Sequence, residues 1–374
     1  QEMTGAEIVL QSLVDQGVEV VFGYPGGAVL PIYDTLFKHN SIKHVLVRQE
    51  GGAIHAAEGY ARSTGKVGVV LVTSGPGATN VVTGLTDAMM DSIPIVCITG
   101  QVPQHLIGSD AFQECDTTGI TRPCTKHNYL VKDPNKLSPV FHEAFTIAQD
   151  GRPGPVLIDI PKDVQFANGT YTEKEKVIIP SHRLFEPEIF KNDEKINEVL
   201  NLISKAKKPI FYIGGGCINS GPKASELVAQ LVEMTGAPAT MTLMGLGVLG
   251  SSHPNSLGML GMHGMYEANM AMHDCDVMIN IGARFDDRVT GRLDAFSPNS
   301  KKIHIDIDES NINKTIKVDV PVVGDVTSVL KRVVKTWKDN NLQTNESDLK
   351  LWWDKINKWK KIDCLHFTNN EKEI

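Results

Sequence analysis

Runs of five to seven mostly apolar residues recur along the first half of the chain, each followed by a loop and a segment with helical periodicity. Strands of a parallel sheet carry such unbroken apolar runs, because helices cover both faces of the sheet. The pattern therefore predicts a doubly wound parallel α/β domain. The predicted strands are residues 18–22, 42–47, 67–73, 94–99 and 156–160.

The same alternation returns in the second half and predicts a second doubly wound parallel-sheet domain. Its Rossmann-like pattern has a nucleotide as its natural ligand. A polar stretch that contains Pro180 and Pro187 separates the two halves and is typical of an interdomain linker. We therefore predict a first domain over 1–165, a linker over 166–194 and a second domain over 195–340. The strands predicted in the second domain are 209–213, one ending at 241–244, 276–282, 302–307 and 320–323.

Composition narrows the class of protein. Of the 374 residues, 41% are apolar and 22% charged, as in soluble globular proteins. A net charge of −7 gives no electrostatic reason to expect binding to nucleic acid or an anionic membrane. No apolar run is long enough to span a bilayer. The six cysteines form no Cys-x-x-Cys pair, which argues against a zinc site or a disulfide scaffold.

Candidate chemistry gathers between residues 47 and 80. Glu50 follows one predicted strand and opens a helix, at 51–62, that is rich in glycine and alanine. The next strand ends in a loop of small residues, 74–78, and Thr79 or Asn80 is expected to cap the following helix. We expect both features at the carboxyl ends of adjacent strands, where open α/β sheets bind ligands. The plainer alternatives are a carboxylate that balances a helix dipole and an ordinary tight turn.

Three further glycine-rich segments need separate interpretations. The loop that contains Gly26 and Gly27 joins a strand to a helix and is weak evidence by itself. Residues 245–250 spell G-x-G-x-x-G, but no helical pattern follows them, so we do not predict a classical dinucleotide site there. The loop 214–216 lies between a predicted strand and helix, and it is the better candidate for binding a diphosphate.

The segments around Glu50 resemble a known family. The residues Arg48-Gln49-Glu50-Gly51-Gly52-Ala53, then 56–62 (AAEGYAR) and 73–80 (TSGPGATN), are similar to the N-terminal domain of thiamine-diphosphate-dependent 2-ketoacid enzymes, most closely to acetolactate synthase (acetohydroxyacid synthase) catalytic subunits. Two positions depart from the family pattern, because Gln49 stands where histidine is usual and Gly51 where glutamine is usual.

The resemblance implies a transferase that decarboxylates pyruvate on thiamine diphosphate. The product then condenses with a second 2-ketoacid, pyruvate or 2-ketobutyrate, in the biosynthesis of valine, leucine and isoleucine. Glu50 would hydrogen-bond the pyrimidine ring of the cofactor and so promote loss of the proton from its reactive carbon. The other residues implied in catalysis are Gln113, Gly26 and Lys162. Those implied in binding thiamine diphosphate, besides Glu50, are Gly27, Pro76 and Asn80.

The second domain resembles the central, FAD-binding domain of the same family. The segments 242–247, 259–264, 282–289 and 304–308 carry this resemblance. For Arg284, Asp287 and Arg288 the plainer alternative is a cluster of ion pairs. The residues implied in FAD binding are Arg152, Gly214, Gly215, Gly216, Thr242, Leu243, Met244, Met262, His263, Gly282, Arg284, Asp286, Arg288, Val289, Asp306, Ile307, Gly324 and Asp325.

The family holds Mg²⁺ and the diphosphate in a third domain, whose G-D-G signature is not matched by Gly324-Asp325-Val326. We therefore expect no metal ligands in this chain and read 341–374 as a linker toward an absent C-terminal domain. Within it, Trp352, Trp353, Ile356 and Trp359 form a helical stripe expected to pack on the domain surface. The chain alone is then expected to be inactive.

The resemblance also implies a homodimer or larger assembly formed through the N-terminal domain, a small regulatory subunit, and a soluble location in a bacterial cytoplasm or plastid stroma. Two alternatives stay open. One is another FAD-containing thiamine-diphosphate enzyme, such as a pyruvate oxidase. Glyoxylate carboligase is a less suitable example of this class, because it lacks the acid that Glu50 supplies. The other is a non-catalytic two-domain protein with an FAD-binding or regulatory role.

Overall fold

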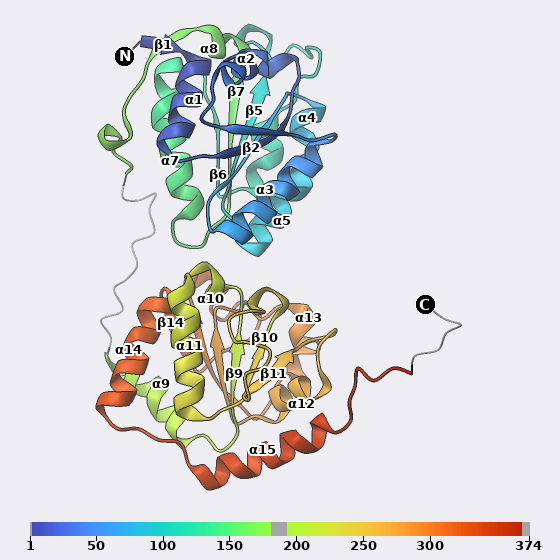
Figure 1. The fold of residues 1–374 in the computed structure, drawn as a ribbon, viewed down its shortest axis with the longest axis vertical. Coiled ribbons are helices and arrows are strands. Elements are labelled where there is room, and N and C mark those ends of the chain that lie inside the picture. The colour runs from blue at the N-terminus through green and yellow to red at the C-terminus, as the bar shows by residue number, and fades with distance from the viewer. Residues whose placement is uncertain (1, 181–192, 369–374) are drawn as a thin grey trace. The chain divides into compact units, whose positions relative to one another are not determined.

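The structure is a computed structural model that describes residues 2–180 and 193–368. The chain divides into two compact units, residues 1–186 and 187–374 (Figure 1). Each unit is built around a six-stranded sheet whose strands are all parallel. The two doubly wound parallel domains that the hydrophobic pattern predicts are thus confirmed. No helix within the described ranges is long and apolar enough to cross a membrane.

The first sheet has the strand order β3-β2-β4-β5-β7-β6. Its central strands β4, β5 and β7 are buried along their whole length, which explains their unbroken apolar sequence. The strands are β2 (Val20–Tyr24), β3 (Lys43–Leu46), β4 (Gly68–Val72), β5 (Ile95–Gln101), β6 (His127–Leu130) and β7 (Pro155–Pro161).

Helices cover both faces of the first sheet and form two separate apolar layers. One face packs against α1 (Gly5–Asp15), α2 (Leu30–Lys38), α7 (Leu137–Gln149) and α8 (Lys162–Phe166). The other face packs against α3 (Glu50–Thr64) and α5 (Val82–Asp91). The short helices α4 (Pro76–Thr79) and α6 (Thr117–Thr121) lie in loops between strands.

The second sheet has the order β11-β10-β9-β12-β13-β14, which is 3-2-1-4-5-6 when its strands are counted along the chain. Strand order therefore reverses between β9 and β12, and a crevice at such a point is where doubly wound sheets bind ligands. The strands are β9 (Pro209–Ile213), β10 (Ala239–Met241), β11 (Ser256–Met259), β12 (Val277–Ile281), β13 (Lys301–Asp306) and β14 (Val320–Val323).

The second unit also has an apolar layer on each face of its sheet. One layer is formed with α9 (Asp193–Lys205), α11 (Pro222–Thr235) and α14 (Val326–Asp339). The other is formed with α12 (Tyr266–Asp274) and α15 (Glu346–Lys360). The short helices α10 (Gly216–Asn219) and α13 (Asp287–Thr290) follow β9 and β12.

Two ordered elements lie inside segments predicted as linkers. Strand β8 (Asn168–Thr170) falls within the predicted linker 166–194 and pairs antiparallel with β1 (Glu2–Thr4), because the chain returns to the edge of the first unit. Residues 181–192 of that predicted linker lie outside the described residues. Helix α15 falls within the predicted linker 341–374, and its Trp352 is buried with the indole Nε1 donating to the Pro209 carbonyl at 3.0 Å.

The helix cap predicted at Thr79 or Asn80 is wrong. The small-residue loop begins its own short helix, α4, and α5 starts two residues later, after Val81, without a side-chain cap. Val81 is buried at this point, so packing of Val81 rather than a capping side chain fixes where α5 starts.

Candidate functional site

The residues predicted to be catalytic lie at the carboxyl edge of the first sheet. Glu50 is the first residue of α3, just after β3, and Gly26 follows β2. The loop 74–78 follows β4. Our prediction that β3 and β4 are adjacent is wrong, since β2 pairs with both and lies between them. The loops after all three strands nevertheless converge, because parallel strands end at the same edge.

A direct hydrogen bond joins Glu50 to the loop after β4. The Asn80 side-chain Nδ2 donates to Glu50 Oε2 at 2.9 Å. A Cβ placed on Gly77 would lie 3.7 Å from Glu50 Oε1, so this part of the loop passes close to the carboxylate. Glu50 is half-buried in this position. The structure thus brings the predicted acid and Asn80 together, although they are thirty residues apart in the chain.

Thr73 explains why glycine occupies both neighbouring loops. Its Oγ1 accepts a hydrogen bond from the Ala28 backbone N–H at 3.2 Å. A Cβ on Gly26 would lie 2.5 Å from the Thr73 side chain, and one on Gly77 would lie 2.7 Å from Thr73 Cγ2. Any side chain at either position would therefore push the β2 and β4 loops apart, which glycine avoids.

Gln113 lies beside the same loop. Gly75 has a φ of +56°, and a Cβ there would lie 2.6 Å from the Gln113 carbonyl oxygen. Gln113 itself has a φ of +58°, a left-handed backbone that is uncommon for a residue with a side chain. This close backbone packing holds the segment after β5 against the turn that contains Pro76.

A buried polar network that the sequence analysis missed anchors that segment. Asp159, on β7, accepts hydrogen bonds from Thr99 Oγ1 at 2.7 Å and from Gln101 Nε2 at 2.9 Å. Gln101 Nε2 also donates to the Cys115 carbonyl at 2.8 Å, two residues beyond Gln113. Burial raises the pKa of Asp159 to about 7. An acidic residue in the otherwise apolar strand 156–160 was the signal that could have revealed it.

The two departures from the family pattern are in contact. Gln49 caps α3, with its Oε1 accepting from the Gly52 N–H at 3.1 Å. A Cβ on Gly51 would lie 2.7 Å from that same oxygen. Glycine at position 51 therefore leaves room for the glutamine at position 49 to fold back as a cap.

Two other predicted residues take different places. Lys162 begins α8, immediately after β7, and so lies at the same edge of the sheet as Glu50. Arg152 precedes β7 and lies at the opposite edge. Its Nε donates to Ser92 Oγ at 2.8 Å and its Nη2 to the Met90 carbonyl at 3.3 Å, at the end of α5. Arg152 therefore holds a helix terminus, and its suggested contact with FAD stays a prediction.

The predicted FAD-binding loops of the second unit also meet at one edge of their sheet. Gly214 to Gly216 follow β9 and Gly282 follows β12, the two strands between which the order reverses. The Gly216 N–H donates to the Gly282 carbonyl at 3.0 Å, and a Cβ on Gly214 would lie 2.2 Å from that oxygen. The loops touch backbone to backbone, and the glycines keep side chains out of the contact.

Several neighbouring side chains are occupied by local bonds. Thr242 Oγ1 accepts from the Gly245 N–H at 3.0 Å, and Asp306 accepts from the Asp308 N–H at 2.8 Å. Asp325 caps α14 through Ser328 and accepts from Ser220 Oγ at 2.5 Å. Gly215 lies against Met244, and Gly324 donates its N–H to the Asp306 carbonyl. Exposed side chains along this edge belong to Leu243, Met262 and His263.

The charged residues after β12 form ion pairs. Arg284 Nη2 lies 2.5 Å from Asp286 Oδ2, and Arg288 Nη1 lies 3.9 Å from Asp287 Oδ2. The structure thus contains ion pairs among these residues, as the plainer alternative to FAD binding predicts. Val289 follows in α13, and Ile307 follows β13 at the same edge.

Comparisons with known proteins match the chain along its whole length. The profile of the thiamine pyrophosphate enzyme N-terminal TPP binding domain matches residues 3–120, and that of the central domain of the same enzymes matches 196–333. Together the two profiles cover more than half of the chain.

Three bacterial relatives illustrate the likeness, each an acetolactate synthase large subunit. The protein of Buchnera aphidicola from Schizaphis graminum is 49% identical over 375 residues, covering 100% of this chain and 64% of the relative. Isozyme 3 of Escherichia coli is 47% identical, covering 100% and 64%. The Haemophilus influenzae protein is 48% identical, covering 98% and 63%. The chain thus spans less than two thirds of the length of these relatives.

Proposed function

Since the chain belongs to the thiamine pyrophosphate enzymes and is similar over its whole length to acetolactate synthase large subunits, we propose that it is part of an acetolactate synthase catalytic subunit. The proposed reaction decarboxylates pyruvate and joins the two-carbon product to a second 2-ketoacid, pyruvate or 2-ketobutyrate. It would serve the synthesis of valine, leucine and isoleucine.

The carboxyl edge of the first sheet fits the pyrimidine half of thiamine diphosphate. A half-buried carboxylate faces a loop kept free of side chains by Gly26 and Gly77. Thiamine diphosphate supplies the carbon nucleophile and the electron sink for decarboxylation. Glu50 would hold a proton at a pyrimidine nitrogen. The Gln113 segment would line the side of the site where the substrate binds. Gly27, Pro76 and Asn80 would shape the binding loop, and Lys162 would lie at its rim.

One observation carries this proposal, the contact between Glu50 and the loop after β4. Asn80 donates to only one carboxylate oxygen of Glu50, at 2.9 Å, and Oε1 lies next to the small Gly77. Asn80 thereby restrains the rotation of the carboxyl group. A general acid–base group needs this kind of fixed direction.

The test is hydrogen–deuterium exchange at the reactive carbon of bound thiamine diphosphate, measured by rapid quench and proton NMR in the intact enzyme. Glu50→Gln keeps the size of the side chain but removes its acid function, and should slow the exchange at least about a hundredfold. Glu19→Gln is the control, since Glu19 pairs with Lys66 at 2.8 Å before β2. Exchange at the wild-type rate in Glu50→Gln would refute the assignment.

We also propose that the second unit binds FAD across the loops after β9 and β12. The place of these glycine loops, after the two strands between which the order reverses, supports this, because doubly wound sheets bind ligands in the crevice at such a point. The binding residues in the second unit would be Gly214, Gly215, Gly216, Thr242, Leu243, Met244, Met262, His263, Gly282, Arg284, Asp286, Arg288, Val289, Asp306, Ile307, Gly324 and Asp325.

Gly216→Ala tests the proposed FAD site. Its Cβ would lie 2.8 Å from Gly282 Cα, whereas a Cβ on Gly250 would meet no atom within 4 Å. Gly216→Ala should weaken FAD binding, followed by quenching of flavin fluorescence, at least about tenfold, while Gly250→Ala should not. Equal affinity in the two variants, with both folded by circular dichroism, would exclude this loop as the binding site.

The assembly follows from the same proposal. The relatives are named large subunits, which implies a smaller regulatory partner, and we expect a homodimer formed through the first unit. Mg²⁺ and the cofactor diphosphate would be bound outside residues 1–374, in a further domain. Sedimentation of the protein with and without a candidate small subunit measures both associations.

A further inference from the structure

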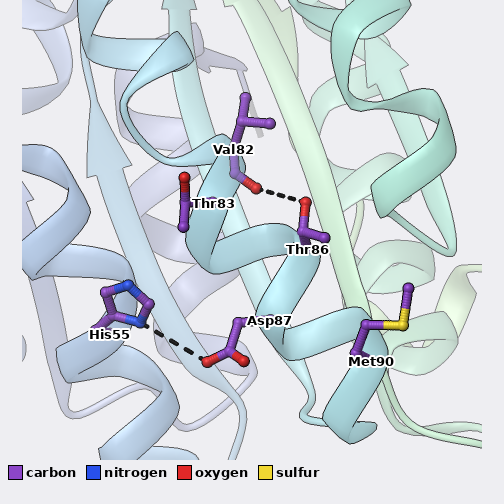
Figure 2. A pocket seen from close by; sticks show the side chains of 6 residues that line it. All are labelled: His55, Val82, Thr83, Thr86, Asp87 and Met90. Atoms are coloured by element: carbon purple, nitrogen blue, oxygen red, sulfur yellow. Dashed lines mark hydrogen bonds and ion pairs between the residues drawn. The ribbon is translucent and has the colours of Figure 1, made fainter. Parts of the chain in front are cut away.

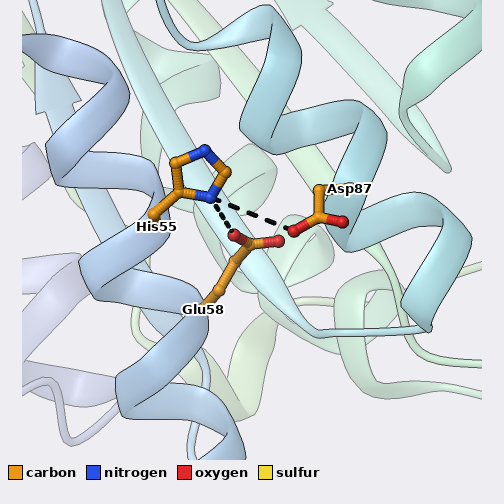
Figure 3. Close-up of side chains that lie close together, drawn as sticks. All are labelled: His55, Glu58 and Asp87. Atoms are coloured by element: carbon orange, nitrogen blue, oxygen red, sulfur yellow. Dashed lines mark hydrogen bonds and ion pairs between the residues drawn. The ribbon is translucent and has the colours of Figure 1, made fainter. Parts of the chain in front are cut away.

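A second group of polar side chains lies between α3 and α5, away from the loop edge. His55 and Glu58 stand one turn apart on α3, and Asp87 faces them from α5 (Figure 3). His55 Nδ1 lies 2.6 Å from Glu58 Oε2 and 3.9 Å from Asp87 Oδ2. One ligand atom from each of the three residues lies within 4.8 Å of the other two, which is the spacing of groups around a single ion.

The most buried of the three lacks a donor for one oxygen. The Glu58 side chain is only 4% exposed, and its Oε1 is buried without a hydrogen-bond partner among the described residues. Figure 3 shows this carboxylate directed into the group, toward Asp87. A buried carboxylate oxygen without a partner is costly, and a second carboxylate beside it adds repulsion. A metal ion or a proton between the two acids would relieve both costs.

The group is open to solvent on one side. His55 and Asp87 have side chains 51% and 50% exposed. They line a hollow of about 600 Å³ between the two helices, with Thr83 and Thr86 on its α5 wall (Figure 2). An ion can thus enter from solvent, and water can complete its coordination.

We propose that His55, Glu58 and Asp87 form a binding site for one divalent transition-metal ion, with Zn²⁺ as the best fit. Zn²⁺ accepts an imidazole nitrogen and carboxylate oxygens in four-coordinate sites, and the fourth ligand here would be water. The mixed nitrogen and oxygen set disfavours Mg²⁺, which prefers oxygen ligands in octahedral geometry. Binding would replace the His55–Glu58 hydrogen bond with two metal–ligand bonds and release the proton between them.

The position of the site gives it a structural consequence. His55 lies little more than one turn after Glu50 on α3, and Asp87 lies in the second turn of α5, a helix that begins two residues after Asn80. An ion that joins the two helices would fix the separation of α3 and α5 close to the contact between Glu50, the first residue of α3, and Asn80, which lies just before α5. The bound ion would therefore hold α3 and α5 together. The presence of this site does not depend on the proposed reaction.

Calorimetric titration of the EDTA-treated, reduced protein with Zn²⁺, and separately with Mg²⁺, tests the proposal. The titrations use a Cys364→Ser background, since Cys364 is an exposed thiol that could bind zinc by itself. His55→Gln and Asp87→Asn each remove one proposed ligand from an exposed position. Asp91→Asn is the matched control, because it removes the same charge one turn further along α5, where Asp91 pairs with Arg62 at 2.7 Å.

We expect one Zn²⁺ per chain, affinity reduced at least about tenfold in His55→Gln and Asp87→Asn, and wild-type affinity in Asp91→Asn. Zinc should also raise the Tm of the parent protein but not that of the two ligand variants. Absence of zinc binding would show that a proton alone occupies the group and would overturn the proposal. Binding that is equal in all variants would place the ion elsewhere and would overturn it as well.

Discussion

At the scale of single residues, buried polar groups decide how the candidate site is held. Glu50 was found from its place after an apolar run, but its partner Asn80 was predicted as a helix cap and is instead a hydrogen-bond donor to the acid. Asp159 was missed although it is an acid in an otherwise apolar strand, because the strand pattern does not show which groups it contacts. Its role follows only from its two donors, Thr99 and Gln101, which other parts of the chain supply.

Asp159 makes stability depend on pH in a specific direction. Burial raises the pKa of Asp159 to about 7 in the folded protein, above the ordinary value of the carboxyl group in an unfolded chain. Between about pH 4 and pH 7 the folded state then binds more protons, so this group's contribution to the free energy of unfolding falls as pH rises. Asp159→Asn abolishes that contribution.

The difference in unfolding free energy between Asp159→Asn and wild type, from urea denaturation, should therefore shift in favour of the variant from pH 5 to pH 7. The expected shift is at most about 2 kcal/mol. Only the change with pH is diagnostic, because the new amide also disturbs the bonds to Thr99 and Gln101. A difference that stays constant over this range would contradict the raised pKa.

At the scale of secondary-structure elements, close helix packing depends on glycine. A Cβ on Gly84, in α5, would lie 2.1 Å from Ile54 Cγ2 of α3, whereas a Cβ on Gly59, on the exposed side of α3, would meet nothing within 4 Å. The hydrophobic pattern predicts both helices but says nothing of how near they approach. Helix capping, by contrast, is readable from the sequence of α1, because Thr4 and Glu7 have the spacing of a capping box and form one in the structure.

These two glycines form a matched pair for a stability test. Gly84→Ala should lower the free energy of unfolding by about 1–3 kcal/mol, because the new methyl group forces α3 and α5 apart. Gly59→Ala should raise it by up to about 1 kcal/mol through helix propensity alone. Chemical denaturation followed by circular dichroism measures both. If Gly84→Ala were as stable as Gly59→Ala, the close packing of α5 on Ile54 would be disproved.

At the scale of the whole molecule, two independent cores organise the chain. The apolar clusters of the first unit share no residue with those of the second. Helix α15 belongs to the second core through the fully buried Trp352 and Ile356. The tryptophan stripe predicted that this helix packs on a domain surface, yet the sequence did not show which face of which sheet it covers.

Trp352→Ala should lower the stability of the second unit only. Loss of a buried tryptophan and of its bond to the Pro209 carbonyl costs about 3–5 kcal/mol. In differential scanning calorimetry, we expect one transition to move to lower temperature while the other keeps its Tm. Leu351→Ala is the control, since Leu351 is 68% exposed on the same helix. A common downward shift of both transitions would show that the two units unfold as one.

The sequence by itself determined the fold class, most of the strands and helices of both sheets, and the family. These follow from local patterns, since strand periodicity, capping residues and motif spacing are properties of neighbouring residues. Only the tertiary structure decided that β2 separates β3 from β4, that Asn80 bonds to Glu50, that Arg152 lies at the opposite edge, and that Asp159 anchors the Gln113 segment. Each of these depends on contacts between residues far apart in the chain, which sheet order and side-chain packing create and which no local pattern encodes.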